Sequence, residues 1–308
     1  MHLASVTQLN LFFSLARGTF SQRDGFDELK TRLKFLLRGL VRLTETLTLL
    51  GYFSRSEALL TFLKNNPGVA TKLQRPYLYK DLTLPGKASI LSNFYCQLES
   101  IFVFDVAARL LNSQDIVLAH IEGREGSMLT IVLSVNRKFP KEGELTLRVV
   151  SEQSVALCSL SFSVIKHYGF LQVYVGGLQG PRPRHGHDPV RQATKSMYGL
   201  FPKKLVVHAL LSVTNALQCE SVRAVSNAQH VSRASARKRE FAADYDEFFV
   251  ECGAVLGSDG LFTLPSALPR KLIEDVESKK RSEYRRRLHA LDQMHVRIRQ
   301  SLCHREVR

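Results

Sequence analysis

The segment from Val173 to Gly180 reads VYVGGLQG, which predicts a buried strand followed by a glycine-rich exit. Glycine has no Cβ, so its backbone can come close to a ligand or to another part of the chain. Phosphate groups often bind to backbone N–H groups exposed in this way. Gly176, Gly177 and Gly180 are therefore candidate anion-binding residues, and the alternative that they only form a turn remains open.

The next helix is expected to begin at Pro202, because proline is favoured in the first turn of a helix. The first N–H groups of a helix have no partner within it and carry a partial positive charge. Lys203 and Lys204 would add full positive charges at the same place. No GxxxxGK[ST] motif is present, so a Walker nucleotide loop is not predicted. The sequence instead predicts a site for a phosphate-bearing small molecule between the glycines and this helix.

Two histidines occur in the sequence HGHD, from His185 to Asp188, between the glycines and Pro202. Zinc needs three or four protein ligands at fixed distances. No further histidine or cysteine pair accompanies these two, and the five cysteines, at positions 96, 158, 219, 252 and 303, form no CxxC motif. We therefore predict no metal site and no disulfide framework, which fits a reducing compartment.

Charge and length limit the classes of function that remain. The chain has 308 residues, and 43 Lys and Arg against 28 Asp and Glu give a formal charge of +15. Such an excess favours binding to polyanions: nucleic acid, anionic lipid or phosphate-bearing ligands. The N-terminal segment lacks the basic start and cleavage site of a signal peptide, and no apolar run reaches the roughly 20 residues of a transmembrane segment. We expect a cytoplasmic protein, with peripheral contact at the inner membrane as an open alternative.

The N-terminal part of the chain is expected to be helical. Leucines recur at three- and four-residue spacing from Leu29 to Leu50, beside basic residues such as Lys30, Lys34 and Arg38, and Gly51 is expected to end this helix. The pattern is typical of a helix that packs its leucines on the rest of the protein. A basic helix with a leucine stripe also suits an anionic membrane surface, which is the less favoured of the two interpretations.

From residue 115 onward the hydrophobic pattern has a period of two, which predicts an antiparallel sheet up to Val175. A helix from Pro202, a strand from Ser221 to Ser226, a helix from Asp244 to Cys252 and a last strand near Phe262 are expected to follow. Strands followed by helices favour the α+β class. The expected parts are a helical region 1–110, an α+β domain 111–268 and a basic C-terminal helix 269–308.

The order of these elements resembles the acyl-CoA N-acyltransferase fold, in which the pyrophosphate of coenzyme A lies at the helix after the fourth strand. Asn227, Tyr245 and Gly253 resemble the Asn, Tyr and Gly of that family's last part, although its Arg/Gln-x-x-Gly-x-Gly/Ala motif is absent. The resemblance implies that coenzyme A or an acyl-CoA binds at the glycines and lysines named above. It also implies that Tyr245 is the general acid for the leaving thiolate. The alternative for Tyr245 is a core position that supports Phe248 and Phe249.

A second resemblance covers most of the chain. Six blocks occur in order between residues 173 and 287: VYVGGLQG, ATKSMYGLFPKKLVVHAL, VRAVSNAQHV, DYDEFFVECGAV, LFTLP and SKKRSEYRRR. Together with RPYLYKDL near residue 75, they are similar to the VirK/YbjX family of Gram-negative bacteria. The resemblance implies a part in virulence, in remodelling of the envelope and in resistance to cationic antimicrobial peptides. None of the blocks is a catalytic fingerprint, so no reaction is implied.

The alternative to an enzyme is a basic regulatory or binding protein. Arg233, the run from Arg237 to Arg239 and the basic segment from Ser278 to Arg287 could contact RNA, an anionic membrane surface or a partner protein. Phosphate contacts of this kind give affinity without sequence specificity and weaken with salt. No RNA-recognition motif or helix-turn-helix is evident, so nucleic acid is the less favoured ligand.

Overall fold

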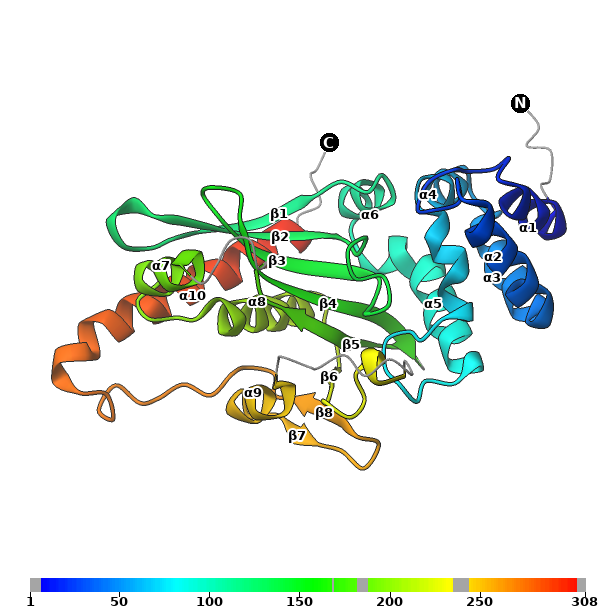
Figure 1. Cartoon of the computed structure of the whole chain (residues 1–308). Coiled ribbons are helices and arrows are strands. Elements are labelled where there is room, and N and C mark those ends of the chain that lie inside the picture. Colours follow the sequence, from blue (N-terminus) through cyan, green and yellow to red (C-terminus); the bar gives the residue numbers. More distant parts are fainter. Residues whose placement is uncertain (1–6, 168, 182–187, 235–243, 304–308) are drawn as a thin grey trace.

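The structure is a computed structural model that describes residues 7–167, 169–181, 188–234 and 244–303. It is a mixed α+β fold, as the change of hydrophobic period predicts (Figure 1). Helices form the N-terminal third, one sheet lies in the middle, and a long helix ends the described chain. Each of these parts contributes residues to a shared apolar core.

The helices of the described residues are α1 (Gln8–Arg17), α2 (Leu29–Val41), α3 (Leu43–Phe53), α4 (Glu57–Asn65), α5 (Leu84–Ile101), α6 (Phe104–Leu111), α7 (Asp188–Ser196), α8 (Pro202–Ala216), α9 (Tyr245–Glu251) and α10 (Ser278–Cys303). Short 3-10 helices are η1 (Pro67–Gln74), η2 (Arg124–Gly126) and η4 (Val231–Ala234). α8 begins at Pro202, as predicted, and the side chain of Ser56 caps α4. α7 was not anticipated.

The strands are β1 (Ile116–Glu122), β2 (Met128–Val135), β3 (Leu145–Ser151), β4 (Ala156–His167), β5 (Phe170–Gln179), β6 (Ser221–Val225), β7 (Val255–Leu256) and β8 (Leu261–Leu264). They form a sheet in the order β1-β2-β3-β4-β5-β6-β8-β7. The first five strands are antiparallel neighbours, which confirms the predicted meander. β5 and β6 run parallel, because the α7–α8 crossover returns the chain to the same end of the sheet.

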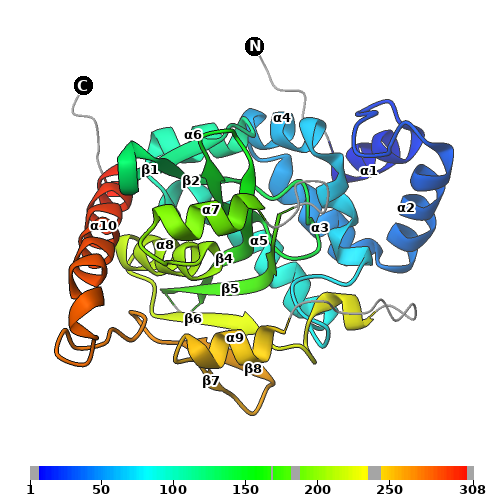
Figure 2. The ribbon, with the colours of Figure 1, turned by 60° about the vertical axis from the view of Figure 1, so that its left-hand side comes forward.

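The two faces of the sheet differ, because side chains alternate along each strand. Leu145 and Leu147 of β3 lie beside Phe162 and Leu160 of β4 on the apolar face, and all four are fully buried. α8 packs on β3 and β4, and α10 packs on α8 and β1 (Figure 2). The opposite face carries polar side chains, including Thr146, and α5 covers only its β4 end.

A buried carboxylate joins this polar face to the N-terminal helices. Glu144 accepts hydrogen bonds from Lys72 Nζ at 2.6 Å, from Tyr77 Oη at 2.8 Å and from the Tyr95 hydroxyl. Tyr77 Oη also lies 3.0 Å from Ser163 Oγ. Burial and the charge of Glu144 raise the pKa of both Tyr77 and Tyr95 well above the ordinary value of a tyrosine. Both phenols therefore remain neutral donors. This network fastens η1 and α5 to the sheet.

The single helix expected from Leu29 to Leu50 is wrong. Arg42 has φ −126° and ψ 45°, outside the helical region, and separates α2 from α3. Its guanidinium donates to the carbonyl oxygen of Leu73 at 2.6 Å, at the end of η1. Gly51 lies inside α3 and does not end it. Leucine spacing alone does not reveal such a break, because it changes the dihedral angles of one residue and leaves the spacing unaltered.

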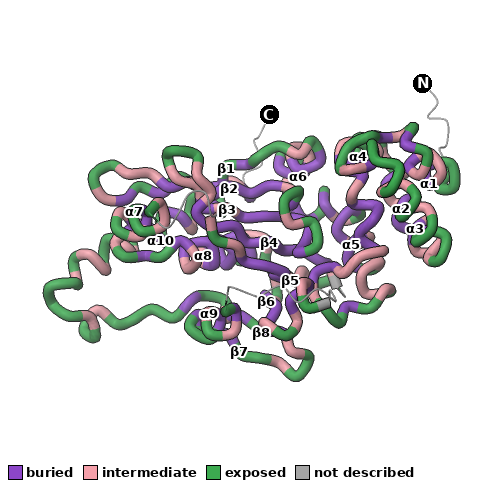
Figure 3. The backbone as a smooth tube through the Cα atoms, in the orientation of Figure 1, coloured by how far each residue is buried: buried purple, intermediate pink, exposed green. Residues whose placement is uncertain are grey.

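The interpretation of the leucines as a core stripe holds for α3 and is wrong for α2. Leu49 and Leu50 of α3 are buried. In α2 only Leu36 is partly buried against the core, and the other four leucines lie largely in solvent (Figure 3). α2 instead packs through Phe35 and Gly39, and a Cβ on Gly39 would overlap the ring of Phe12 in α1. A small residue and one aromatic therefore make the close contact, and the leucine face turns outward.

Candidate functional site

The predicted glycines lie within a strand. β5 continues to Gln179, beyond the expected end at Val175. Val175 pairs with Phe162 and Gly177 with Ser161, so Gly176 is the extra residue of a β-bulge. A Cβ on Gly176 would collide with the carbonyl oxygen of Glu142, and one on Gly177 with the Glu142 carboxylate. The close approach that these two glycines allow is that of the β2–β3 loop.

β5 and β6 part beside these glycines, and Tyr245 fills the gap. The last pair of the two strands is Val175 with Ala224. Beyond it, Tyr245 Oη accepts a hydrogen bond from the Leu178 amide at 3.0 Å and donates to the Leu178 carbonyl oxygen at 2.9 Å. Burial and the charge of Glu142 raise the pKa of Tyr245, which is 2% exposed. The hydroxyl thus takes the hydrogen bonds that a neighbouring strand would otherwise supply.

Asn227 sets the position of Tyr245. Its Oδ1 accepts a hydrogen bond from the Tyr245 amide at 2.9 Å, and its Nδ2 donates to Asp244 Oδ1 at 2.8 Å. Asp244 caps α9 by accepting from the amides of Asp246 and Glu247. The Asn and Tyr named in the acyltransferase resemblance therefore do meet, across an intervening segment of which residues 235–243 are not described.

Two residues that the sequence analysis missed lie beside Tyr245. Glu142 Oε1 accepts a hydrogen bond from Gln179 Nε2 at 3.1 Å and lies 3.6 Å from His230 Nε2. The ring centroids of His230 and Tyr245 are 5.4 Å apart. No motif signals this cluster, because its members come from the β2–β3 loop, β5, the segment after β6 and α9.

Lys203 and Lys204 contact α9 rather than the glycines. Lys204 Nζ forms an ion pair with Glu251 Oε2 at 3.1 Å, and Lys203 Nζ lies 6.0 Å from the ring centroid of Phe248. Gly180 follows β5 and has open space where a Cβ would be. His185 and His187 lie outside the described residues. Within the described part of the chain, no group of three His, Cys, Asp or Glu side chains could hold a metal ion.

Changing Tyr245 to phenylalanine tests whether its hydroxyl serves the fold. Tyr245→Phe is expected to lower the free energy of unfolding by about 1–3 kcal/mol, because it leaves a buried N–H and C=O of Leu178 without partners. Tyr284→Phe is the matched control. The Tyr284 hydroxyl bonds the amide and carbonyl of Lys271 in the same way, but on the exposed surface, so its loss should cost less than about 0.5 kcal/mol. Equal stability of both variants in urea unfolding would contradict the structural role.

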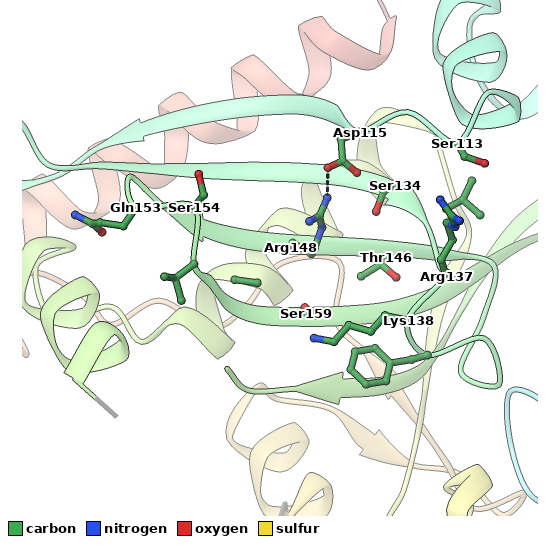
Figure 4. A pocket seen from close by; sticks show the side chains of 14 residues that line it. Ser113, Asp115, Ser134, Arg137, Lys138, Thr146, Arg148, Gln153, Ser154 and Ser159 are labelled. Carbon is green, nitrogen blue, oxygen red and sulfur yellow. Dashed lines mark ion pairs between the residues drawn. The ribbon is translucent and has the colours of Figure 1, made fainter. Parts of the chain in front are cut away.

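A hollow on the polar face of the sheet was not predicted. It has a volume of about 600 Å³ and lies over β2, β3 and β4 (Figure 4). The hydroxyls of Ser134, Thr146 and Ser159 line it, and Arg137 and Lys138 stand at one end. Arg148 on β3 forms an ion pair with Asp115 at 2.6 Å. Hydroxyl and cationic donors therefore converge on one cavity.

Two further cavities continue from this hollow toward α2. The first, of about 150 Å³, shares Arg137 with the sheet cavity and is also lined by Lys72. The second, of about 400 Å³, shares Arg75 and Lys141 with the first. We call the three together the basic groove. Its cationic lining is Lys34, Arg38, Lys72, Arg75, Arg137, Lys138, Lys141 and Arg148, and its only carboxylates among the described residues are Asp24 and Asp115.

The α2 end of the groove holds the least compensated charge. Lys34, Arg38, Arg75 and Lys141 line the 400 Å³ cavity, and in the described chain no carboxylate lies within ion-pair distance of any of them. Burial and the nearby charge of Arg38 lower the pKa of Arg75. Lys34 and Arg38 lie in the predicted basic helix and Arg75 in the block RPYLYKDL, but no sequence pattern links these segments to each other or to Lys141.

Comparison with known proteins agrees with the second resemblance. A family model described as "Protein of unknown function (DUF535)" matches residues 24–300. An Escherichia coli protein named "Uncharacterized protein YbjX" is 33% identical over 292 residues, which cover 94% of this chain and 88% of that protein. An uncharacterized protein of Haemophilus influenzae is 32% identical over 192 residues, 62% of this chain and 63% of its own length. No solved structure matches the chain significantly.

The family model extends from before α2 into α10, so it includes every residue of the basic groove as well as Tyr245. No helix of the described residues is long and apolar enough to cross a bilayer. The chain belongs to the DUF535 family, the VirK/YbjX family that its sequence blocks resemble.

Proposed function

We propose that this chain binds a phosphate-bearing anionic molecule in the basic groove and acts in this way at the bacterial envelope. The observation that carries the proposal is the cavity lined by Lys34, Arg38, Arg75 and Lys141 with no carboxylate. Cations held together without a counter-charge repel one another, and a bound anion removes that repulsion. The envelope setting, and a part in virulence and antimicrobial-peptide resistance, are predictions from the family resemblance.

Not every cation near the cavity is available for a ligand. Arg42 donates to the carbonyl oxygen of Leu73, and Lys87 Nζ donates to that of Arg75 at 2.9 Å. These two side chains satisfy carbonyl groups at the end of η1, which is an ordinary structural task. Within the described part of the chain, no carbonyl oxygen or carboxylate accepts a hydrogen bond from the guanidinium of Arg38 or Arg75. A guanidinium matches the geometry of phosphate with paired N–H donors. Arg38 and Arg75 are therefore the proposed phosphate ligands.

The size of the groove limits the ligand. Its two larger cavities, of about 400 and about 600 Å³, fall within the roughly 300–1,000 Å³ of ordinary small-molecule sites. The sheet cavity offers hydroxyls, which suit the polar part of a phosphorylated sugar, glycerol or headgroup. The proposal is for binding, and it assigns no reaction to the groove.

Removing two groove cations should abolish most of this binding. Arg38→Ala with Lys141→Ala is expected to weaken binding of inorganic pyrophosphate and of glycerol 3-phosphate by at least about tenfold, because each charge-assisted hydrogen bond contributes roughly 1.5–3 kcal/mol. Titration calorimetry at two salt concentrations measures this change. The control, Arg285→Ala with Arg286→Ala, removes the same charge from exposed positions on α10 and should change affinity less than about twofold. No binding by the unaltered chain, or equal losses in both variants, would reject the groove.

Acyl transfer is a second candidate, favoured by the parting of β5 from β6 after Val175. In this proposal coenzyme A lies at Gly176, Gly177, Gly180, Lys203 and Lys204, and Tyr245 protonates the thiolate. An acyl-CoA between the strands would have to displace the Tyr245 hydroxyl from Leu178. Coenzyme A binding that survives loss of Arg38 and Lys141 but not of Lys203 and Lys204 would favour this function over the groove.

A further inference from the structure

The outer face of α2 is a continuous apolar stripe. Leu29, Leu33, Leu37 and Leu40 are 72%, 51%, 57% and 48% exposed, and Val41 is 82% exposed. At 100° per residue, these five side chains fall within about 120° of the helix circumference. We call them the leucine stripe. A patch of this kind on a single helix is unlike the scattered exposed apolar residues of an ordinary surface and indicates an interaction site.

Positive charge borders the stripe on one side. Lys30, Lys34 and Arg38 are exposed and follow the leucines around the helix. α2 contains no acidic residue. It lies at the outer edge of the molecule, where neither the sheet nor α10 covers it (Figure 2). The same Lys34 and Arg38 line the basic groove, so the groove opens beside the stripe.

We propose that α2 lies flat on an anionic lipid surface. The leucine stripe would enter the boundary between headgroups and acyl chains, while Lys30, Lys34 and Arg38 contact lipid phosphates. A helix with leucines on one face and lysine or arginine beside them has the composition of interfacial helices. Its 13 residues span roughly 20 Å, enough to lie along a bilayer surface and too few to cross it.

Charge argues against the other occupants of this face. A second copy of the chain would bring two sets of cations together, because α2 offers no carboxylate to pair with them. A basic or neutral protein would leave the same cations uncompensated. An anionic lipid surface suits both the leucines and the cations, since its acyl chains can bury the leucine side chains and its phosphates can pair with the lysines and the arginine.

This inference stands on α2 and does not require that the groove bind a soluble ligand. If both hold, the docked helix places the mouth of the groove at headgroup level. The phosphate-bearing molecule of the proposed function would then be the headgroup of an anionic lipid rather than a free metabolite. Binding of glycerol 3-phosphate without vesicle binding would support the groove and reject the docking.

Co-sedimentation with vesicles tests the docking. The full chain is mixed with vesicles of phosphatidylcholine alone and with vesicles containing about one third phosphatidylglycerol. Selective binding to the anionic vesicles is expected, and Leu33→Asn with Leu37→Asn should lower the partition coefficient by about tenfold or more, because two leucine side chains no longer gain from burial. The control, Val255→Thr with Leu256→Thr, removes exposed apolar surface from β7, 71% and 55% exposed, and should leave binding unchanged.

Three results would overturn the proposal. They are equal binding to neutral and anionic vesicles, no binding to either, and equal losses in the α2 and β7 variants. Light scattering on the same samples examines the second-copy alternative. A dimer that Leu33→Asn with Leu37→Asn converts to a monomer, while vesicle binding is unaltered, would assign the stripe to self-association instead.

Discussion

Lys72→Met is expected to lower the free energy of unfolding by about 3–5 kcal/mol, because it leaves the carboxylate of Glu144 buried without its counter-charge. Lys72 and Glu144 are both almost fully buried, and their charged atoms are 2.6 Å apart. Tyr77 and Tyr95 also donate to this carboxylate, but neutral hydroxyls compensate only part of its desolvation. Urea unfolding followed by far-ultraviolet circular dichroism measures the loss.

The double variant Lys72→Met with Glu144→Gln separates the lost charge from lost packing. A neutral glutamine has no buried charge to compensate; its Oε1 still accepts from one tyrosine, and its amide N–H can donate to the hydroxyl oxygen of the other. The double variant should therefore be more stable than Lys72→Met alone. Lys280→Met is the surface control, since Lys280 pairs with Glu277 at 3.2 Å in solvent and should lose less than about 1 kcal/mol. If the double variant is no more stable than the single one, the buried charge is not the cause.

Local sequence patterns predict the helices and strands of this fold better than they predict the contacts between them. The alternation in β4 and the proline at the start of α8 each depend on neighbours in the sequence, and both predictions hold. The network around Glu144 joins residues that are distant in the sequence: Lys72, Tyr77 and Tyr95 lie 72, 67 and 49 positions before it. No periodicity encodes such a meeting, because it is set by how η1 and α5 pack on the sheet.

The basic groove and the leucine stripe are two further features that local sequence patterns do not predict. Arg38 and Lys141 share no motif, so no local pattern indicates that they line one cavity. The α2 leucines carry a clear motif, but a stripe of correct period does not say whether it faces the core or solvent. Phe35 and Gly39 decide this, because they allow α2 to approach Phe12 of α1. The tight contact of a small residue outweighs the longer leucine pattern.

Gly176→Ala is expected to destabilise the chain by about 3 kcal/mol or more, at the upper end of the usual cost of overpacking. The new Cβ would meet the carbonyl oxygen of Glu142 and would lie 3.0 Å from that of Leu78. Both obstacles are backbone atoms, so relief requires movement of the β2–β3 loop or of the segment before α5. Gly176 has no positive φ, so alanine introduces no dihedral strain of its own.

Two neighbouring glycines make a graded series with this variant. Gly177→Ala meets the Glu142 carboxylate, which can rotate away at the cost of its contacts with Gln179 and His230, so a smaller loss is expected. Gly180→Ala has open space and should change stability by less than about 0.5 kcal/mol. Urea unfolding of the three variants gives the order directly. A glycine needed for the approach of a ligand would behave in the opposite way: its alanine variant would keep its stability and lose binding. A stable Gly176→Ala that no longer binds coenzyme A would therefore support the predicted anion site at the end of β5.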